Sequence, residues 1–142
     1  MNVRFRAMTI ADYPAVLQLW KRAGELNPDV KGSESKAAVA AFLKRNPKLS
    51  LVGVAGTKMV AAALVGHDGR RGYLHRVAVD AAHRGEGLGR TLMDHAMINL
   101  RTVDVYRATM LICVDNAAAR GFSTHCGWSH RTDLVVMQQD LR

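Results

Sequence analysis

The most informative stretch of this 142-residue chain is Arg84-Gly-Glu-Gly-Leu-Gly-Arg90. It lies between a strand-like apolar run over residues 73–79 and a pattern of helical spacing that continues to about Leu100. A helix begins with backbone N–H groups that lack helical partners and with the positive end of the helix dipole. Glycines let the backbone approach a ligand closely, and the two arginines add positive charge. The stretch therefore predicts a binding loop for a pyrophosphate-containing ligand.

Two common glycine-rich phosphate motifs do not fit this stretch. The dinucleotide-binding pattern G-x-G-x-x-G, started at Gly85, requires a glycine where Arg90 stands. The P-loop pattern G-x-x-x-x-G-K-[ST] requires a lysine at that same position and a glycine where Arg84 stands. A third interpretation, a glycine-rich turn that only begins a helix, is left open by these residues.

Hydrophobic periodicity outside the loop predicts strands and helices in alternation. A capping box formed by Thr9 and Asp12 predicts a first helix that ends near Gly24, and Gly56 and Gly69 mark two hairpin turns. The other predicted helices cover residues 35–45, the stretch from the loop to about 100, and 116–126; the predicted strands are 3–6, 49–55, 59–65, 73–79, 109–114 and 134–137. Hairpins followed by a β-α-β crossover imply an α/β fold of the mixed α+β kind, with helices on the faces of one sheet.

The composition is typical of a globular domain. Hydrophobic residues make up 49% of the chain and charged residues 23%, so we expect a single domain over residues 1–142. The first residues lack the apolar stretch of a signal peptide, and no apolar run reaches the about 18 residues of a membrane helix. Cys113 and Cys126 are too few for a disulfide framework. We expect a cytoplasmic protein with no membrane partner.

The charge balance is strongly basic, with a formal net charge of +8. Charge alone leaves three interpretations open: nucleic-acid binding, attraction of a small polyanionic ligand, and an effect on solubility. The 2 Trp, 3 Tyr and 3 Phe show no interleaved stacking pattern of a single-strand binder, so we expect no nucleic-acid partner. His125, Cys126 and His130 lack the number and spacing of a metal site, and no metal is expected.

The loop matches a family signature. The pattern Arg/Gln-x-x-Gly-x-Gly/Ala between a strand and a helix is met by Arg84, Gly87 and Gly89, and it resembles the acetyl-CoA pyrophosphate loop of the GNAT superfamily of N-acetyltransferases. Downstream, Asn116-x-x-Ala119 followed by Gly127-Trp128 is similar to a second signature of that family. The resemblance covers about residues 49–137. It implies acetyl-CoA as co-substrate and a mostly antiparallel sheet of about six to seven strands flanked by four helices.

The resemblance also assigns residues to the cofactor. The exposed backbone of the strand before the loop is expected to pair with the pantetheine arm as an added strand would. An N–H group near Val79 is expected to face the acetyl carbonyl oxygen. Asn116 is equally well explained as a helix N-cap. The expected cofactor-binding residues are Val77, Ala78, Val79, Arg84, Gly85, Glu86, Gly87, Leu88, Gly89, Arg90, Asn116, Ala119 and Phe122.

Three further residues are catalytic candidates. The stretch Leu74-His-Arg-Val-Ala-Val79 is similar to one in the arylalkylamine N-acetyltransferases, in which a histidine faces the acceptor; His75 is therefore the candidate base, and a histidine packed in the core is the alternative. Strand alternation predicts that Tyr73, His75, Val77 and Val79 share one face, with Tyr73 as a wall of the pocket. Ser123 stands where many members of the family carry a tyrosine that protonates the leaving thiolate, a role that Ser123 could fill only through water.

These observations predict an acetyl-CoA-dependent N-acetyltransferase that modifies a primary amine of a small molecule, peptide or protein by direct transfer in a ternary complex. Packing explains Cys113 and Cys126 better than catalysis does. Two other functions stay open: a non-catalytic acyl-CoA-binding or sensing domain, which the missing tyrosine favours, and a basic nucleic-acid-binding module, which is less favoured. The acceptor cannot be read from the sequence, and a homodimer is compatible with the resemblance.

Overall fold

The computed structural model describes residues 2–23 and 26–141, which fall into two compact units, Met1–Leu111 and Ile112–Arg142. The prediction of one domain over residues 1–142 stays a prediction. The first unit contains β1 (Val3–Ala7), η1 (Ile10–Asp12), α1 (Tyr13–Ala23), α2 (Lys36–Arg45), β2 (Leu51–Ala55), β3 (Lys58–His67), β4 (Arg71–Val79), η2 (Ala81–His83), α3 (Leu88–Thr102) and β5 (Arg107–Met110). The second unit contains α4 (Ala117–His125).

The strands of the first unit form one mixed sheet in the order β1-β2-β3-β4-β5. Neighbouring strands from β1 to β4 are antiparallel, whereas β4 and β5 are parallel. Two parallel neighbours need a crossover connection, and α3 supplies it because it follows β4 and precedes β5. The mixed, mostly antiparallel sheet and the four helices confirm that part of the predicted fold.

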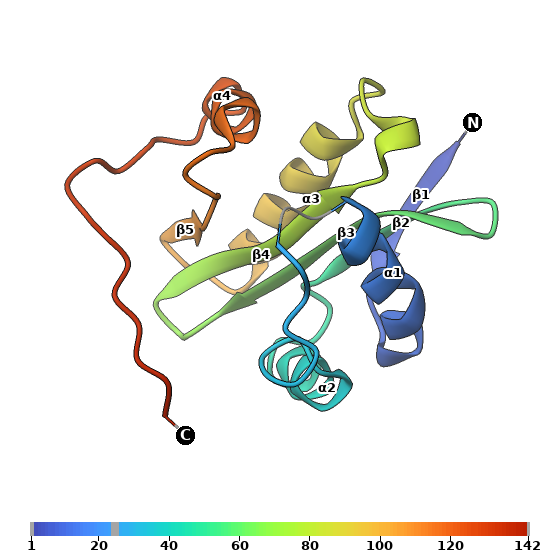
Figure 1. Cartoon of the computed structure of the whole chain (residues 1–142), viewed down its shortest axis with the longest axis horizontal. Helices are drawn as coiled ribbons and strands as arrows, with labels where there is room; N and C mark the ends of the chain where they lie inside the picture. The colour runs from blue at the N-terminus through green and yellow to red at the C-terminus, as the bar shows by residue number, and fades with distance from the viewer. Residues whose placement is uncertain (1, 24–25, 142) are drawn as a thin grey trace. The chain divides into compact units, whose positions relative to one another are not determined.

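Helices cover both faces of the sheet (Figure 1). On one face, Ala62 and Leu64 of β3 belong to a core cluster with Leu19 of α1 and Val39 of α2. On the other face lies α3, because a Cβ added at Gly72 would stand 2.8 Å from Leu100 Cδ1. Gly72 pairs with His67, an odd-numbered residue of β3. The β3 residues that face α1 and α2, Ala62 and Leu64, are even-numbered, so Gly72 lies on the opposite face of the sheet. The sheet is therefore the middle layer of three.

Local side-chain contacts explain where the first two helices begin. The Asp12 carboxylate accepts a hydrogen bond from the Thr9 N–H at 2.9 Å, and α1 follows immediately. Ser35 Oγ accepts from the Ala38 N–H at 3.1 Å and caps α2. These contacts agree with the predicted capping box and with the predicted helix over residues 35–45. The predicted end of the first helix at Gly24 lies outside the described residues.

Three strand predictions differ from the structure. The sheet has five strands within residues 2–23 and 26–141, not six to seven. Residues 134–137 form no strand, and their side chains are exposed, from 61% at Leu134 to 86% at Met137. The predicted strand 109–114 is displaced, because β5 runs from Arg107 to Met110. An apolar run becomes a strand only where a neighbouring strand completes its hydrogen bonds, and periodicity does not report that neighbour.

No helix within the described ranges has the length and apolar composition needed to cross a membrane. The same part of the chain contains no group of three or more His, Cys, Asp or Glu side chains arranged to hold a metal ion.

Candidate active site

The glycine-rich loop reaches the start of α3 in a conformation that glycine favours. Gly85 and Gly87 have φ angles of 84° and 77°, and Gly87 is the N-cap residue of α3. A Cβ added at either glycine would meet no atom within 4 Å, so the space beside the loop is open. Leu88, Gly89 and Arg90 form the first turn, where backbone N–H groups have no acceptor inside the helix. An anion beside this turn would meet backbone donors and the positive end of the helix.

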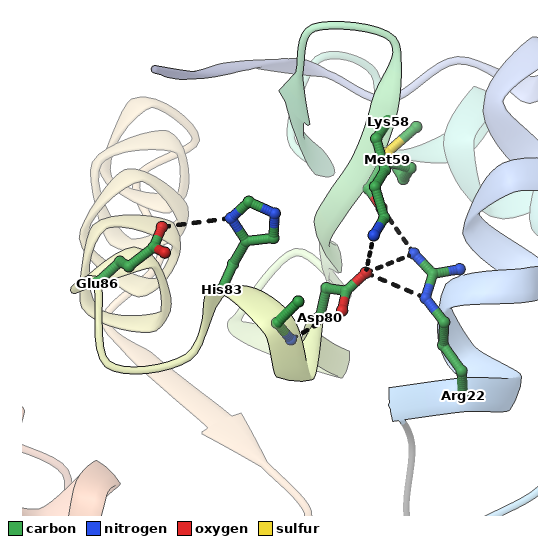
Figure 2. Close-up of polar contacts among 7 residues, drawn as sticks. Arg22, Lys58, Met59, Asp80, His83 and Glu86 are labelled. Carbon is green, nitrogen blue, oxygen red and sulfur yellow. Dashed lines mark hydrogen bonds and ion pairs between the residues drawn. The ribbon is translucent and has the colours of Figure 1, made fainter. Parts of the chain in front are cut away.

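The chain enters this loop through Asp80, which directly follows β4 (Figure 2). Asp80 Oδ1 accepts from the Ala82 N–H at 3.0 Å and caps the short η2 turn. Asp80 Oδ2 accepts from Arg22 of α1, at 3.2 Å from Nε and 3.0 Å from Nη2, and Lys58 Nζ lies 3.4 Å away. Arg22 also donates to the Met59 carbonyl at 2.8 Å. The Asp80 carboxylate thus joins the end of β4 to α1 and to the start of β3.

The Asp80 carboxylate is ionised and nearly inaccessible to solvent. Its side chain is 8% exposed. The hydrogen bond from the Ala82 amide, followed by those from Arg22 and Lys58, outweighs the cost of burial and lowers the pKa of Asp80 to about 2. The cap and the ion pairs of Asp80 therefore persist at physiological pH.

Other contacts hold the two ends of the loop. The His83 ring lies 3.3 Å from the Glu86 carboxylate, as Figure 2 also shows. Arg84 Nη2 donates to the Ala23 carbonyl, the last residue of α1, at 3.4 Å. Arg90 lies 4.0 Å from Asp94, one turn further along α3. Both predicted arginines are exposed and flank the glycines.

A β-bulge interrupts β4 in the middle of the predicted site. His75 pairs with Leu64, but the next pairs are Ala78 with Ala62 and Val79 with Ala61, so β4 contains one residue more than β3. Arg76 lies at this bulge with a φ of 54°. The extra residue reverses the alternation, and Val79 therefore faces the side of the sheet opposite to His75. The prediction that Tyr73, His75, Val77 and Val79 share one face is wrong for this reason.

Tyr73 and His75 are brought together by the structure. Their rings stack with centroids 5.8 Å apart and planes 9° apart, and the Phe42 ring of α2 meets the His75 ring edge-on at 6.1 Å. His75 nevertheless keeps an exposed part. Burial by these neighbours lowers the pKa of His75 below its ordinary value, and the negative charge of Glu34 partly offsets the decrease. The imidazole is thus mainly neutral at neutral pH and can accept a proton.

Beyond the bulge, the pairing of β4 with β5 has already ended. Pairing between β4 and β5 runs from Arg71 to Leu74 and stops there. Val77 is 36% exposed. Among the described residues, no strand pairs with the Val77–Val79 backbone on the β5 side, which leaves an edge to which an extended ligand can be added.

The remaining predicted residues lie on α4, in the unit Ile112–Arg142. Asn116 Oδ1 accepts from the Ala119 N–H at 2.9 Å, so Asn116 is the N-cap of this helix and Ala119 supplies the capped amide. Phe122 is 42% exposed, whereas Ser123 is 6% exposed. The cap interpretation of Asn116 is confirmed.

Sequence reasoning did not find the residues that support the site. Asp80 bonds to Arg22 across 58 positions of the chain, and Arg76 bonds to Glu34 across 42. A single sequence carries no signal for such distant pairs. An available local signal was the placement of Asp80 directly after a strand and two residues before Ala82, where aspartate commonly caps a turn.

A family model for the acetyltransferase (GNAT) family matches residues 13–128, which is most of the chain. This chain belongs to the GNAT acetyltransferase family. As a member, it is an acyltransferase that uses acetyl-CoA, and such enzymes act on amine acceptors. No curated protein sequence matches this acetyltransferase significantly.

Solved structures resemble this GNAT acetyltransferase over nearly its whole length. A putative acetyltransferase from Agrobacterium tumefaciens is 25% identical, with a TM-score of 0.77 and coverage of 96% of this chain and 99% of the other. The ribosomal-protein-S18-alanine N-acetyltransferase from Escherichia coli is 23% identical, with a TM-score of 0.78 and coverage of 92% and 80%. The PaiA N-acetyltransferase from Thermoplasma acidophilum, solved with coenzyme A, is 14% identical, with a TM-score of 0.79 and coverage of 91% of both chains.

Proposed function

We propose that this acetyltransferase moves the acetyl group of acetyl-CoA directly to a primary amine of a small molecule or peptide, with His75 as the base. The observation that carries the proposal is the placement of a neutral, partly exposed imidazole on β4, the strand that leads through Asp80 into the loop at the start of α3.

The loop and the strand before it supply the proposed cofactor site. Acetyl-CoA fits this site because the open space beside Gly85 and Gly87 lets backbone donors reach a diphosphate. Arg84 and Arg90 add positive charge on either side. The open edge of β4 at Val77, Ala78 and Val79 suits the pantetheine arm. Gly89 with Glu86 and Leu88 completes the proposed set in the loop. The cofactor roles of Asn116, Ala119 and Phe122, which belong to the unit Ile112–Arg142, are proposed from the resemblance of the sequence alone.

His75 removes a proton from the acceptor in the proposed mechanism. A protonated primary amine must lose a proton before its nitrogen can attack the acetyl carbonyl, and a neutral imidazole accepts that proton. When bound, acetyl-CoA supplies the activated acyl group. A backbone N–H near Val79 is proposed to donate to the carbonyl oxygen, where negative charge develops. Tyr73 packs along one face of the His75 ring and is proposed to form a wall of the acceptor pocket.

The leaving group needs little help from an acid. A thiol has an ordinary pKa of about 8.5, so coenzyme A leaves readily as a thiolate. Ser123 is the proposed route for a proton through water, in place of the tyrosine found in many family members. No covalent enzyme intermediate is proposed, and the two cysteines have no assigned role.

A thiol-release screen across classes of amine acceptor tests this proposal. We expect coenzyme A release that depends on the acceptor for the unmodified protein, and a loss of at least about 100-fold in His75→Ala. Undiminished activity of His75→Ala would contradict the base assignment. Binding of acetyl-CoA without thiol release for any amine would instead favour a sensing domain, the function that the serine at position 123 also suits. Failure to bind acetyl-CoA in calorimetry would contradict the whole site.

A cytoplasmic location and a homodimer are proposed from the sequence alone. The location is proposed because the low cysteine content suits the reducing cytoplasm. A homodimer is proposed from the resemblance to the family, and equilibrium sedimentation tests it.

A further inference from the structure

Residues 26–35, the described part of the chain before α2, form hydrogen bonds with β4 through the side chain of Arg76; they are called the 26–35 segment below. Arg76 Nη1 donates to the Leu26 carbonyl at 2.6 Å, and Nη2 donates to the Asn27 carbonyl at 3.0 Å. Nη2 also donates to Glu34 Oε1 at 2.8 Å. One guanidinium therefore contacts both ends of the 26–35 segment, which in Figure 1 runs down toward α2.

This ion pair is well shielded from solvent. The side chains of Arg76 and Glu34 are 16% and 18% exposed. The guanidinium also lies 5.9 Å from the centroid of the Trp20 ring of α1. Glu34 accepts from the Asp29 N–H at 2.8 Å, and its own carbonyl accepts from the Tyr13 hydroxyl at 2.7 Å. Each partner is fixed by several contacts, unlike an exposed pair that solvent screens.

The backbone at Arg76 is unusual for the residue that occupies it. A φ of 54° is rare outside glycine, and Arg76 adopts it at the bulge that separates His75 from the open edge of β4. Strain of this kind persists where the surroundings enforce it. The contacts of the guanidinium with the 26–35 segment hold the side chain of this residue in place.

The carboxylate of the pair also acts electrostatically on the proposed base. Burial alone would raise the pKa of Glu34, but the hydrogen bonds from the Asp29 amide and from Arg76 hold this pKa below its ordinary value, so Glu34 is charged at neutral pH. That charge acts on His75 and favours its protonated form. Other neighbours of His75 include Tyr73 and Arg76 on its own strand, Phe42 of α2 and Leu64 of β3.

We propose that the Arg76–Glu34 pair is a positioning device for the acceptor side of the site: it holds the 26–35 segment against the bulge of β4 and sets the charge next to His75. The inference rests on the proposed role of His75 as base. Arg76 and Glu34 are positioning residues in this scheme, because they act through the segment and through His75 and need not touch either substrate.

Two substitutions separate the parts of this device. Arg76→Gly removes every guanidinium contact and leaves a residue that tolerates the φ of the bulge, so the strand keeps its course. We expect the KM of the acceptor to rise at least about tenfold, because several hydrogen bonds to a charged group are lost, while the KM of acetyl-CoA stays within about twofold. Arg76→Lys keeps the charge but cannot bridge three oxygen acceptors in a fixed plane, so it should rescue only in part.

Glu34→Gln tests the charge. The amide keeps the size of the side chain and removes the negative charge that favours protonated His75, so the pKa of His75 should fall further. Titration of the His75 ring by NMR in the full-length protein measures this without any turnover, and the acid limb of kcat/KM should move to lower pH in parallel. Asp104→Asn is the matched control, because it removes an exposed carboxylate from the turn after α3, and asparagine tolerates the φ of 60° there.

The results distinguish this inference from the function on which it rests. If His75→Ala keeps its activity, the base assignment is wrong, yet the NMR titration and the split between the two KM values still test the pair. An unchanged pKa of His75 in Glu34→Gln, together with an equal rise of both KM values in Arg76→Gly, would overturn the inference. A thermal unfolding curve close to that of the unmodified protein shows that each variant is folded.

Discussion

Asp80 Oδ2 lies 3.0 Å from Arg22 Nη2, and this ion pair connects the residue after β4 to the last turn of α1. Asp80 makes a second contact in addition to this pair: its other oxygen, Oδ1, accepts from the Ala82 N–H and caps the turn that leads into the glycine-rich loop. A single carboxylate thus both joins the end of β4 to α1 and caps the turn that leads into the loop.

Substitution of Asp80 should separate these two contributions. Asp80→Ala removes the cap and the ion pair and should lower the free energy of unfolding by about 2 kcal/mol. Asp80→Asn keeps an oxygen for the Ala82 amide, so it should lose less stability and less affinity for acetyl-CoA. Chemical denaturation and calorimetry measure the two quantities. Equal losses in both variants would show that the cap contributes nothing.

The low pKa of Asp80 also predicts how stability depends on acid. Its folded value of about 2 lies below the ordinary unfolded value of about 3.9, so the folded state gains stability from this group above the unfolded value. The gain is lost as the pH falls from about 4 toward 2. Comparison of acid unfolding between the unmodified protein and Asp80→Asn, which cannot titrate, checks the sign.

Gly87→Ala should damage cofactor binding more than stability. The left-handed φ costs an alanine about 1 kcal/mol, and the new methyl group would stand in the open space where the diphosphate is proposed to lie. Gly56→Ala is the matched control, since Gly56 has a φ of 63° in the β2–β3 turn and equally open surroundings. Both variants should lose similar stability, but only Gly87→Ala should weaken acetyl-CoA binding, by at least about tenfold. Similar affinities in the two variants would contradict the position of the diphosphate.

The activity should depend on pH through His75. The base acts when neutral, and burial lowers the pKa of this imidazole, so kcat/KM should rise with pH through a midpoint below the ordinary histidine value of about 6.5. The plateau should include neutral pH. In His75→Gln this limb should disappear together with most of the activity. A midpoint above the ordinary value would contradict the environment described for the ring.

Two substitutions of Asn116 can separate its role as the N-cap of α4 from a direct contact with the cofactor. Asn116→Ala removes the acceptor of the Ala119 amide and should cost about 1 kcal/mol. Asn116→Ser can still cap α4 and should recover most of that stability. If acetyl-CoA affinity follows the cap, Asn116→Ser should bind nearly as well as the unmodified protein. Loss of binding in a stable Asn116→Ser would assign the amide a direct role.

The sequence predicted those features that local patterns encode. The loop 84–90 precedes a helix, and the hairpins between residues 49 and 79 form, because turn glycines and apolar periodicity are local signals. The strand at 134–137 failed because its apolar run lacks a pairing neighbour among the described residues. The bulge was missed because arginine carries no preference for the left-handed conformation that Arg76 adopts, and the alternation assumed for Val79 failed with it.

The partly unpaired β4 has a consequence for the protein between turnovers. A strand edge with free amide and carbonyl groups is a template for any extended polypeptide, including another molecule of the same protein. The pantetheine arm of acetyl-CoA, if it lies along Val77–Val79, would cover this edge reversibly. Depletion of acetyl-CoA would then lower the rate of reaction and would also leave this edge open to association with other polypeptides. Binding of the cofactor would in this way help to keep the enzyme soluble.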